Sequence, residues 1–218
     1  MGEVEARRPL KIRDTRLANW IARTLSHREI TPNQISLISI VFAALAGACL
    51  LLLPLLSGWL LPVLAAFFIQ CRLLCNLFDG MVAVEGGKST PAGELFNDIP
   101  DRIADPLILV SAGYAISAVD WGSDIGWLAG LLAVMTAYVR NLATAVGAPT
   151  NFSGPMAKQH RMALMTVACL FAAVAEPQWW PQGYIFLIAL MLICIGSWVT
   201  VWRRVESAYQ YLETSRRV

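Results

Sequence analysis

The stretch NLFDGMVAVEGGKSTPAGELFNDIPD, residues 76–101, places acidic and amide side chains inside a chain that is otherwise strongly apolar. Asp79 and Asp101 lie near its two ends, and Asn76, Asn97 and Asp98 accompany them. Polar groups are costly in a membrane-like sequence, and they occur there mainly where they do chemical work. This stretch therefore predicts that the two helices on either side of it face each other. It also predicts a functional site between them.

The rest of the sequence predicts an all-α integral membrane protein. Of its 218 residues, 57% are apolar and 15% are charged, and its apolar runs approach the roughly 20 residues that a helix needs to cross a bilayer. Six transmembrane helices are expected, at 34–53, 59–84, 92–118, 125–147, 162–175 and 184–201. The fifth gives the poorest signal, because it is short and ends just before Glu176.

The positions of the basic residues favour an even number of spans with both termini in the cytoplasm. Seven Lys and Arg residues precede the first span, and the connections at 54–58, 118–124 and 176–183 contain none. Lys and Arg concentrate in short cytoplasmic loops. We expect a multi-pass protein of a plasma or inner membrane whose basic face meets anionic lipid headgroups, and no nucleic-acid partner.

The segment before the first span predicts an amphipathic helix at residues 14–28, lying in the membrane interface. Its apolar residues Leu17, Trp20, Ile21 and Leu25 are three or four apart; the alternative is a solvated basic tail. Thr31 can then cap the first span with Pro32 in its first turn. The chain divides into a cytoplasmic segment (1–33), a transmembrane domain (34–203) and a cytoplasmic tail (204–218).

Helical geometry predicts that the polar residues of the 76–101 stretch lie on one face of each of two helices. At about 100° per residue, one stripe of the second span and one of the third are polar, and a short loop joins them. The stripes contain Arg72, Asn76, Asp79 and Ala83 on one helix and Glu94, Asn97, Asp98, Asp101 and Asp105 on the other. Oxygen ligands from two facing helices suit Mg²⁺, which commonly pairs one or two carboxylates with substrate phosphates.

The spacing of these residues resembles the signature of the CDP-alcohol phosphotransferase family. In that signature an Asp is followed at three by Asp-Gly and then by Ala-Arg, with a Gly and two further Asp after it. Here NLFDGMVAV, eight residues and GELFNDIPD fit this frame without an insertion, with Asn76, Asn97 and Val84 in place of two Asp and the Arg. A Thr31-Pro32-Asn33 start of the first span extends the resemblance over most of the chain.

The resemblance implies a metal-dependent enzyme that takes a CDP-linked lipid donor, transfers its phosphoalcohol group to a small acceptor alcohol, and releases CMP. It implies Asp101 as the general base and Asp79 as its catalytic partner. One or two Mg²⁺ or Mn²⁺ ions are implied, and so is a homodimer. The implied metal ligands are Asn76, Asp79, Asn97, Asp98 and Asp101, and the nucleotide and diphosphate contacts are Pro32, Asn33, Gly80, Ala83 and Gly93.

Two Asn in place of two Asp leave three possibilities for the metal site: one ion, a weaker pair, or recruitment of Asp98 or Asp105. Because Asp98 is next to Asn97, we expect it to supply the missing charge, so that Asp98→Asn abolishes metal-dependent turnover. Gly80 and Gly93 leave room for a pyrophosphate to approach the backbone, or else they serve only close helix packing.

Basic residues on the same side of the membrane predict a pocket for the phosphate of the donor or of a phosphorylated acceptor. Arg140 lies near the cytoplasmic end of the fourth span, and Lys158 and Arg161 lie at the start of the fifth. The alternative for Lys158 and Arg161 is contact with lipid headgroups. Two other classes of protein stay open: a membrane scaffold that binds CDP-lipid with weakened catalysis, and a transporter with an ion site at mid-membrane.

Overall fold

The computed structural model describes residues 24, 31–56, 58–85, 93–175 and 181–215, and the described chain is all-helical. Within these ranges, four helices are long and apolar enough to cross a membrane. Of the other two, one carries Asp98 and Asp101, and the other carries Lys158 and Arg161. The predicted all-α membrane bundle is confirmed. Its helices are α2 (Pro32–Leu52), α3 (Leu60–Glu85), α4 (Gly93–Tyr114), α5 (Gly122–Ala145), α6 (Lys158–Ala175) and α7 (Tyr184–Ser215).

The first membrane helix begins where its cap predicts. The Thr31 hydroxyl accepts from the backbone N–H of Gln34, and the Gln34 side chain accepts from the Thr31 N–H, which completes a capping box with Pro32 in the first turn. The expected interfacial helix at 14–28 lies outside the described residues, apart from Thr24. The start of α2 is therefore fixed by local hydrogen bonds, and the first turn of α2 lies near residues of the 76–101 stretch.

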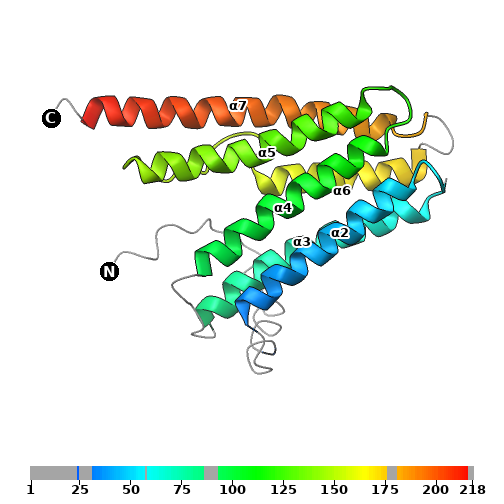
Figure 1. Cartoon of the computed structure of the whole chain (residues 1–218), viewed down its shortest axis with the longest axis horizontal. Helices are drawn as coiled ribbons and strands as arrows, with labels where there is room; N and C mark the ends of the chain where they lie inside the picture. Colours follow the sequence, from blue (N-terminus) through cyan, green and yellow to red (C-terminus); the bar gives the residue numbers. More distant parts are fainter. Residues whose placement is uncertain (1–23, 25–30, 57, 86–92, 176–180, 216–218) are drawn as a thin grey trace.

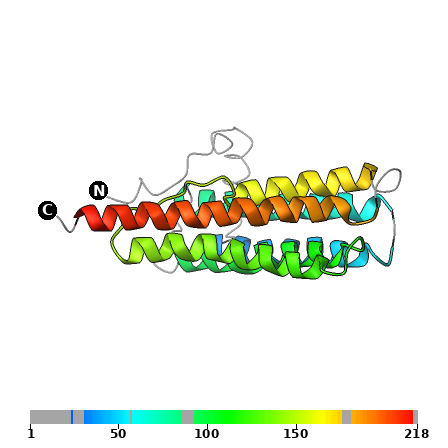
Figure 2. The same ribbon diagram turned by 90° about the horizontal axis from the view of Figure 1, so that it is seen from above.

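The six helices form a closed ring of neighbours. Each packs on the next in the order α2, α4, α5, α7, α6, α3, and α3 returns to α2. Seen from above, the ring is flattened into two layers, with α3, α6 and α7 in one and α2, α4 and α5 in the other (Figure 2). Residues 76–101 thus connect the two layers, because they include the end of α3 in one layer and the start of α4 in the other.

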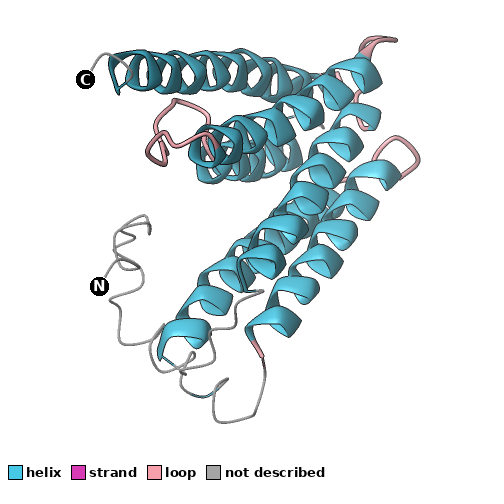
Figure 3. Cartoon of the chain, turned by 60° about the vertical axis from the view of Figure 1, so that its left-hand side comes forward, coloured by secondary structure: helices cyan, strands magenta, loops and turns pink. Residues whose placement is uncertain are grey.

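The helices are close together at one end of the bundle and diverge at the other. Figures 1 and 3 show α2, α3 and α4 splaying away from α5, α6 and α7. The start of α2, the end of α3, the start of α4 and the start of α6 all lie toward the diverging end. With 32 residues, α7 is about 48 Å long at 1.5 Å per residue, more than the roughly 30 Å of a bilayer core.

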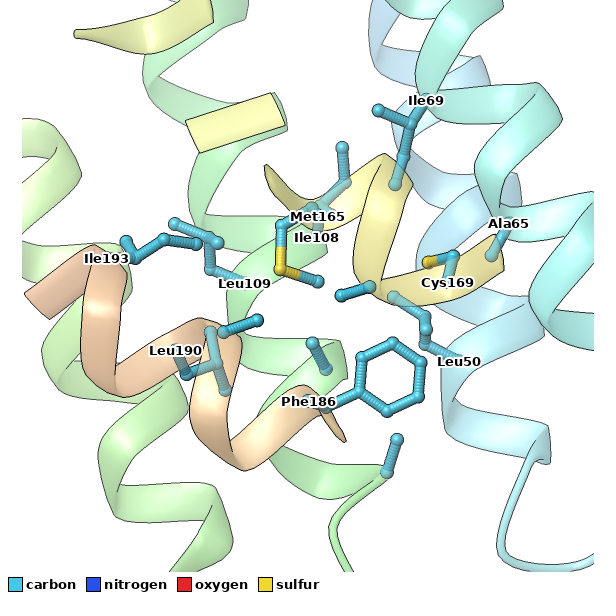
Figure 4. Close-up of a cluster of buried hydrophobic side chains, with 14 of the residues drawn as sticks. Leu50, Ala65, Ile69, Ile108, Leu109, Met165, Cys169, Phe186, Leu190 and Ile193 are labelled. Atoms are coloured by element: carbon cyan, nitrogen blue, oxygen red, sulfur yellow. The ribbon is translucent and has the colours of Figure 1, made fainter. Parts of the chain in front are cut away.

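The core that holds the ring together lies where helices from both layers meet. Leu50 of α2, Ile108 of α4, Met165 of α6 and Phe186 of α7 are completely buried and converge on one cluster (Figure 4). Lipid tails are as apolar as these side chains, so close van der Waals packing, more than removal from water, drives such contacts in a membrane. The packing of this cluster sets the spacing of α4 and α6, which carry most of the charged residues described below.

Small residues bring α4 and α5 into backbone contact. A Cβ atom on Gly113 would lie 2.7 Å from the Cα of Gly126, a distance that side-chain carbons do not adopt. We expect Gly113→Val to push the helices apart and to destabilise the protein by about 1–3 kcal/mol, the usual cost of overpacking. Thermal unfolding in detergent measures this loss. Ala44→Val on an exposed face of α2 is the matched control, and equal stability of the two variants would contradict the close contact.

Candidate active site

The carboxylate of Asp79 is buried at the end of α3 against the first turns of α2. Its side chain accepts a 2.7 Å hydrogen bond from the Ser36 hydroxyl, and the residue is 3% exposed. Ser36 lies one turn after Pro32, so this bond brings the start of α2 to the acidic motif. Lys158 and Asp101 are close enough to act on Asp79 electrostatically. The bond between Ser36 and Asp79 therefore joins the start of α2 to the end of α3.

The carboxylate of Asp101 is held between two cationic side chains. Arg72 of α3 donates from Nη2 to Oδ1 at 2.9 Å, and Lys158 at the start of α6 pairs with Oδ2. Asp101 is 6% exposed, whereas Arg72 is completely buried. The acidic stripe of α4 and the basic start of α6 are thus parts of one site.

Asp105 extends this network one turn deeper along α4. It accepts from Arg72 Nη2 at 2.6 Å on one oxygen and from Arg161 Nη2 at 2.9 Å on the other. Arg161 also donates to the Thr136 hydroxyl of α5 and to the backbone oxygen of Met156. A buried ion network with so many hydrogen bonds fixes the relative positions of α3, α4 and α6.

The two Asn residues of the motif have different surroundings. The Asn76 side chain has both its nitrogen and its oxygen buried, with no hydrogen-bond partner among the described residues. Asn97 is exposed on α4. Buried polar atoms are normally paired, so the amide of Asn76 is available to a ligand or to a water molecule.

The oxygen donors of the site decide how well it fits the divalent cation that the resemblance implies. No group of three or more His, Cys, Asp or Glu side chains within the described ranges is arranged to hold a metal. Asp79, Asp101 and the free Asn76 oxygen supply the kind of oxygen donors that Mg²⁺ or Mn²⁺ takes, to be completed by substrate phosphates. The donor set therefore fits one ion bound together with a substrate, and it does not fit two ions bound by the protein alone.

Asp98 is committed to other partners, which argues against its expected compensation for Asn97. Its Oδ1 accepts from Arg102 at 2.7 Å and from Arg140 at 3.0 Å, and its Oδ2 accepts from Asn141 at 2.9 Å. Like those of Asp101, both oxygens of Asp98 accept from other side chains, but the partners of Asp98 include Arg102 of its own helix and two residues of α5 at the edge of the site. The same contacts tie up Arg140, whose guanidinium also lies over the Phe152 ring at 5.4 Å. Asp98 joins α4 to α5 at the edge of the site.

We consequently expect Asp98→Asn to leave substrate-dependent metal binding intact. Because the Asp98 and Arg140 side chains are partly exposed, breaking their ion pair costs at most about 1 kcal/mol of stability. Electron paramagnetic resonance of Mn²⁺ in the presence of CDP measures metal binding, and thermal unfolding measures the change in stability. Loss of Mn²⁺ binding in a folded Asp98→Asn protein would restore Asp98 as a ligand.

The expected nucleotide contacts lie around this network. Pro32 and Asn33 form the first turn of α2, and Gly80 and Ala83 follow Asp79 on α3; all four are partly exposed. Gly93, also partly exposed, begins α4. Their places at converging helix ends agree with a shared pocket, whereas their contact with a nucleotide stays a prediction.

Three site residues had no role assigned from the sequence. Ser36 contacts a residue 43 positions away, and no local pattern marks such a contact. Arg72 was placed on the polar stripe of its helix, but its pairing with α4 depends on how the helices pack. Arg204 begins the segment expected as a cytoplasmic tail, but it lies on α7, is buried, and donates to the backbone oxygens of Ser153 and Thr136. Gly154, in a left-handed conformation against Thr200, lets that loop approach α7.

Fold and site together define a helical membrane protein with paired carboxylates and cations at one end of its bundle, a class suited to phosphate-bearing substrates. The chain belongs to the CDP-alcohol phosphatidyltransferase family, whose sequence profile matches residues 29–202. Membership confirms the resemblance carried by residues 76–101. It also confirms the expected class of activity, a transferase that moves a substituted phosphate group from a CDP-alcohol.

Characterised relatives are similar over nearly the whole chain. Archaetidylinositol phosphate synthase of Pyrococcus horikoshii is 28% identical over 194 residues, which are 88% of this chain and 91% of the relative. Phosphatidylinositol phosphate synthase of Mycolicibacterium smegmatis is 23% identical over 198 residues, which are 88% and 83% of the two chains. Both relatives are named for the same kind of product.

Solved structures of the Mycobacterium tuberculosis phosphatidylinositol phosphate synthase share the fold. A form with CDP-DAG bound matches with a TM-score of 0.72 at 20% identity, covering 89% of this chain and 94% of that one. A form in complex with manganese and citrate matches with a TM-score of 0.74 at 17% identity, covering 88% of each chain. The ring of helices is therefore the architecture of these synthases.

Proposed function

We propose that the protein transfers the phosphatidyl group of CDP-diacylglycerol, or of a closely related CDP-linked lipid, to a hydroxyl of a phosphorylated alcohol such as an inositol phosphate. CMP is the second product. The observation that carries the proposal is that Asp101, in the family's spacing, pairs with Lys158 and with Arg72. Arg72 in turn pairs with Asp105, which also pairs with Arg161, and Asp79, the other motif carboxylate, is buried on the same helix as Arg72. The relatives named for inositol phosphate products support this choice of acceptor.

The chemistry requires one bond to form and one to break at the phosphorus of the donor lipid. The acceptor oxygen attacks this phosphorus, the bond from phosphorus to the CMP oxygen breaks, and the hydroxyl proton leaves. Asp101, which is oriented by Arg72 and Lys158, is the carboxylate that accepts that proton. A divalent cation, Mg²⁺ or Mn²⁺, when bound by Asp79, Asp101 and Asn76, supplies charge stabilisation for the diphosphate and the departing CMP.

Other parts of the chain bind and orient the two substrates. The helix ends at Pro32, Asn33, Gly80, Ala83 and Gly93 would receive the CDP moiety, where small or helix-starting residues let a nucleotide approach the backbone. The Lys158 side chain is 28% exposed, so it can pair with Asp101 and still meet a phosphate of the acceptor.

The assembly and orientation of the protein are also proposed. We infer that both termini are cytoplasmic, because the basic residues concentrate on that side, and that the chain forms a homodimer, as the resemblance implies. Labelling of cysteines introduced at Ser57 and Asp120 from outside intact cells tests the orientation. Cross-linking in native membranes tests the dimer.

The decisive experiment for the acceptor uses purified protein, labelled CDP-diacylglycerol, Mg²⁺ or Mn²⁺, and a panel of alcohols. We expect CMP release with inositol phosphate and much less with inositol, glycerol or serine, because only the phosphorylated alcohol can use the cationic residues. Release with a neutral alcohol alone would contradict the proposed acceptor. Binding of the lipid without CMP release under any condition would favour the scaffold instead.

A further inference from the structure

We propose that two side chains of this protein, Arg72 and Lys158, replace one of two possible metal ions, so that the site binds a single divalent cation and does so only together with a diphosphate. The inference deepens the proposed function and rests on it. It concerns the order in which metal and donor enter the site.

The first observation is that the charges of the described site are already balanced. The described site holds three carboxylates, on Asp79, Asp101 and Asp105, and three cations, on Arg72, Lys158 and Arg161. All of them except Asp79 are joined by ion pairs. Five of these six residues are buried, and the sixth, Lys158, contacts a buried carboxylate. A buried network that is neutral without metal has no surplus negative charge to attract a divalent ion.

The second observation concerns the two motif positions that lack a charge. Four carboxylates could balance two divalent ions, but here Asn76 and Asn97 stand where the family frame has Asp, and Asn97 is exposed. A divalent ion entering the neutral network alone would bring two uncompensated charges into a low-dielectric region, at high cost. The diphosphate of a CDP-alcohol carries the negative charge that removes this cost.

The third observation is a set of buried polar atoms that await a partner. Arg72 has Nε and Nη1 unpaired within the described structure, and Asn76, one turn later on α3, has its nitrogen and oxygen unpaired. These atoms offer three donor groups and one acceptor side by side. The Asn76 oxygen suits a cation, and the donors suit a phosphate oxygen or a water that bridges to it. A metal and diphosphate arriving together would satisfy both kinds of group at once.

The test measures Mn²⁺ binding to the purified full chain in lipid nanodiscs by electron paramagnetic resonance, with and without CDP. Mn²⁺ with CDP but without protein gives the blank. We expect one Mn²⁺ per wild-type chain with CDP, and binding of Mn²⁺ that is weaker by at least about tenfold without CDP. The double variant Asn76→Asp/Asn97→Asp restores two carboxylates and should bind Mn²⁺ without CDP at least about tenfold more tightly than wild type.

Lys158→Met separates the contribution of a protein cation from that of the missing carboxylates. It removes the partly exposed cation beside Asp101 and should also strengthen Mn²⁺ binding without CDP by about tenfold. Arg203→Met, on an exposed face of α7, is the matched control and should change nothing. Two Mn²⁺ per wild-type chain without CDP, or no effect of Lys158→Met, would overturn the inference. Absence of CMP formation from any donor and acceptor would defeat the proposed function, while these binding results would still decide the inference.

Discussion

Asp101→Asn is expected to lower the rate of CMP release by at least about a hundredfold, the loss typical of removing a general base. An amide cannot accept the proton of the attacking hydroxyl, although it keeps the size of the carboxylate and can still accept one bond from Arg72. Steady-state release of labelled CMP from CDP-diacylglycerol, at saturating acceptor, measures the effect. The fall should appear in kcat more than in KM.

Asp101 also pairs with two cations, so its variant must be shown to fold. Thermal unfolding of Asp101→Asn and binding of CDP by isothermal calorimetry provide this check. Asp120→Asn, at an exposed position near the start of α5, is the matched control and should retain full activity. A folded Asp101→Asn protein with more than a tenth of the wild-type rate would assign the base to another residue.

Asp105→Asn is expected to produce the largest loss of stability among single changes to the network, about 3–5 kcal/mol. The reason is that Asp105 is 3% exposed and pairs with both Arg72 and Arg161. The change would leave the buried Arg161 without a carboxylate partner and Arg72 with Asp101 as its remaining one. Thermal unfolding in detergent, with the rate of irreversible inactivation at fixed temperature, measures the loss.

A second variant separates loss of the ion pairs from loss of packing. Asp105→Asn combined with Arg161→Met removes the cation that the single change leaves without a carboxylate partner, so part of the stability should return. If the double variant is as unstable as the sum of the single changes, the two residues do not stabilise each other, and the network account of the site is wrong.

The membrane helices could be predicted from the sequence because their apolar runs are long and their loops are distinct. Expected spans such as 125–147 differ from the observed helices by a few residues. The exception is α7, which continues to Ser215, well past the expected end of its span at 201. A hydropathy pattern shows where the membrane-embedded part of a helix ends, and it does not show where the helix itself ends.

The candidate site was only partly predictable, for a physical reason. Spacing along one helix identifies residues on a common face, so Asp79 and Asp101 could be found from periodicity and from the family frame. The contacts of Ser36 and Arg72 join different helices, and they depend on which helices are neighbours in the ring. A single sequence does not contain that information in local form. The pairing of Asp98 with Arg140 was missed for the same cause.

The most direct test of the account follows the phosphorus atom itself. Purified protein is given CDP-diacylglycerol labelled at the phosphatidyl phosphorus, with Mn²⁺ and inositol phosphate, and the lipid product is identified by mass spectrometry. The account predicts that the label appears in a new phospholipid in equal amount to the CMP released, and that Asp101→Asn prevents both. Label that stays in CDP-diacylglycerol, or that leaves as free phosphatidic acid with the acceptor untouched, would contradict transfer at this site.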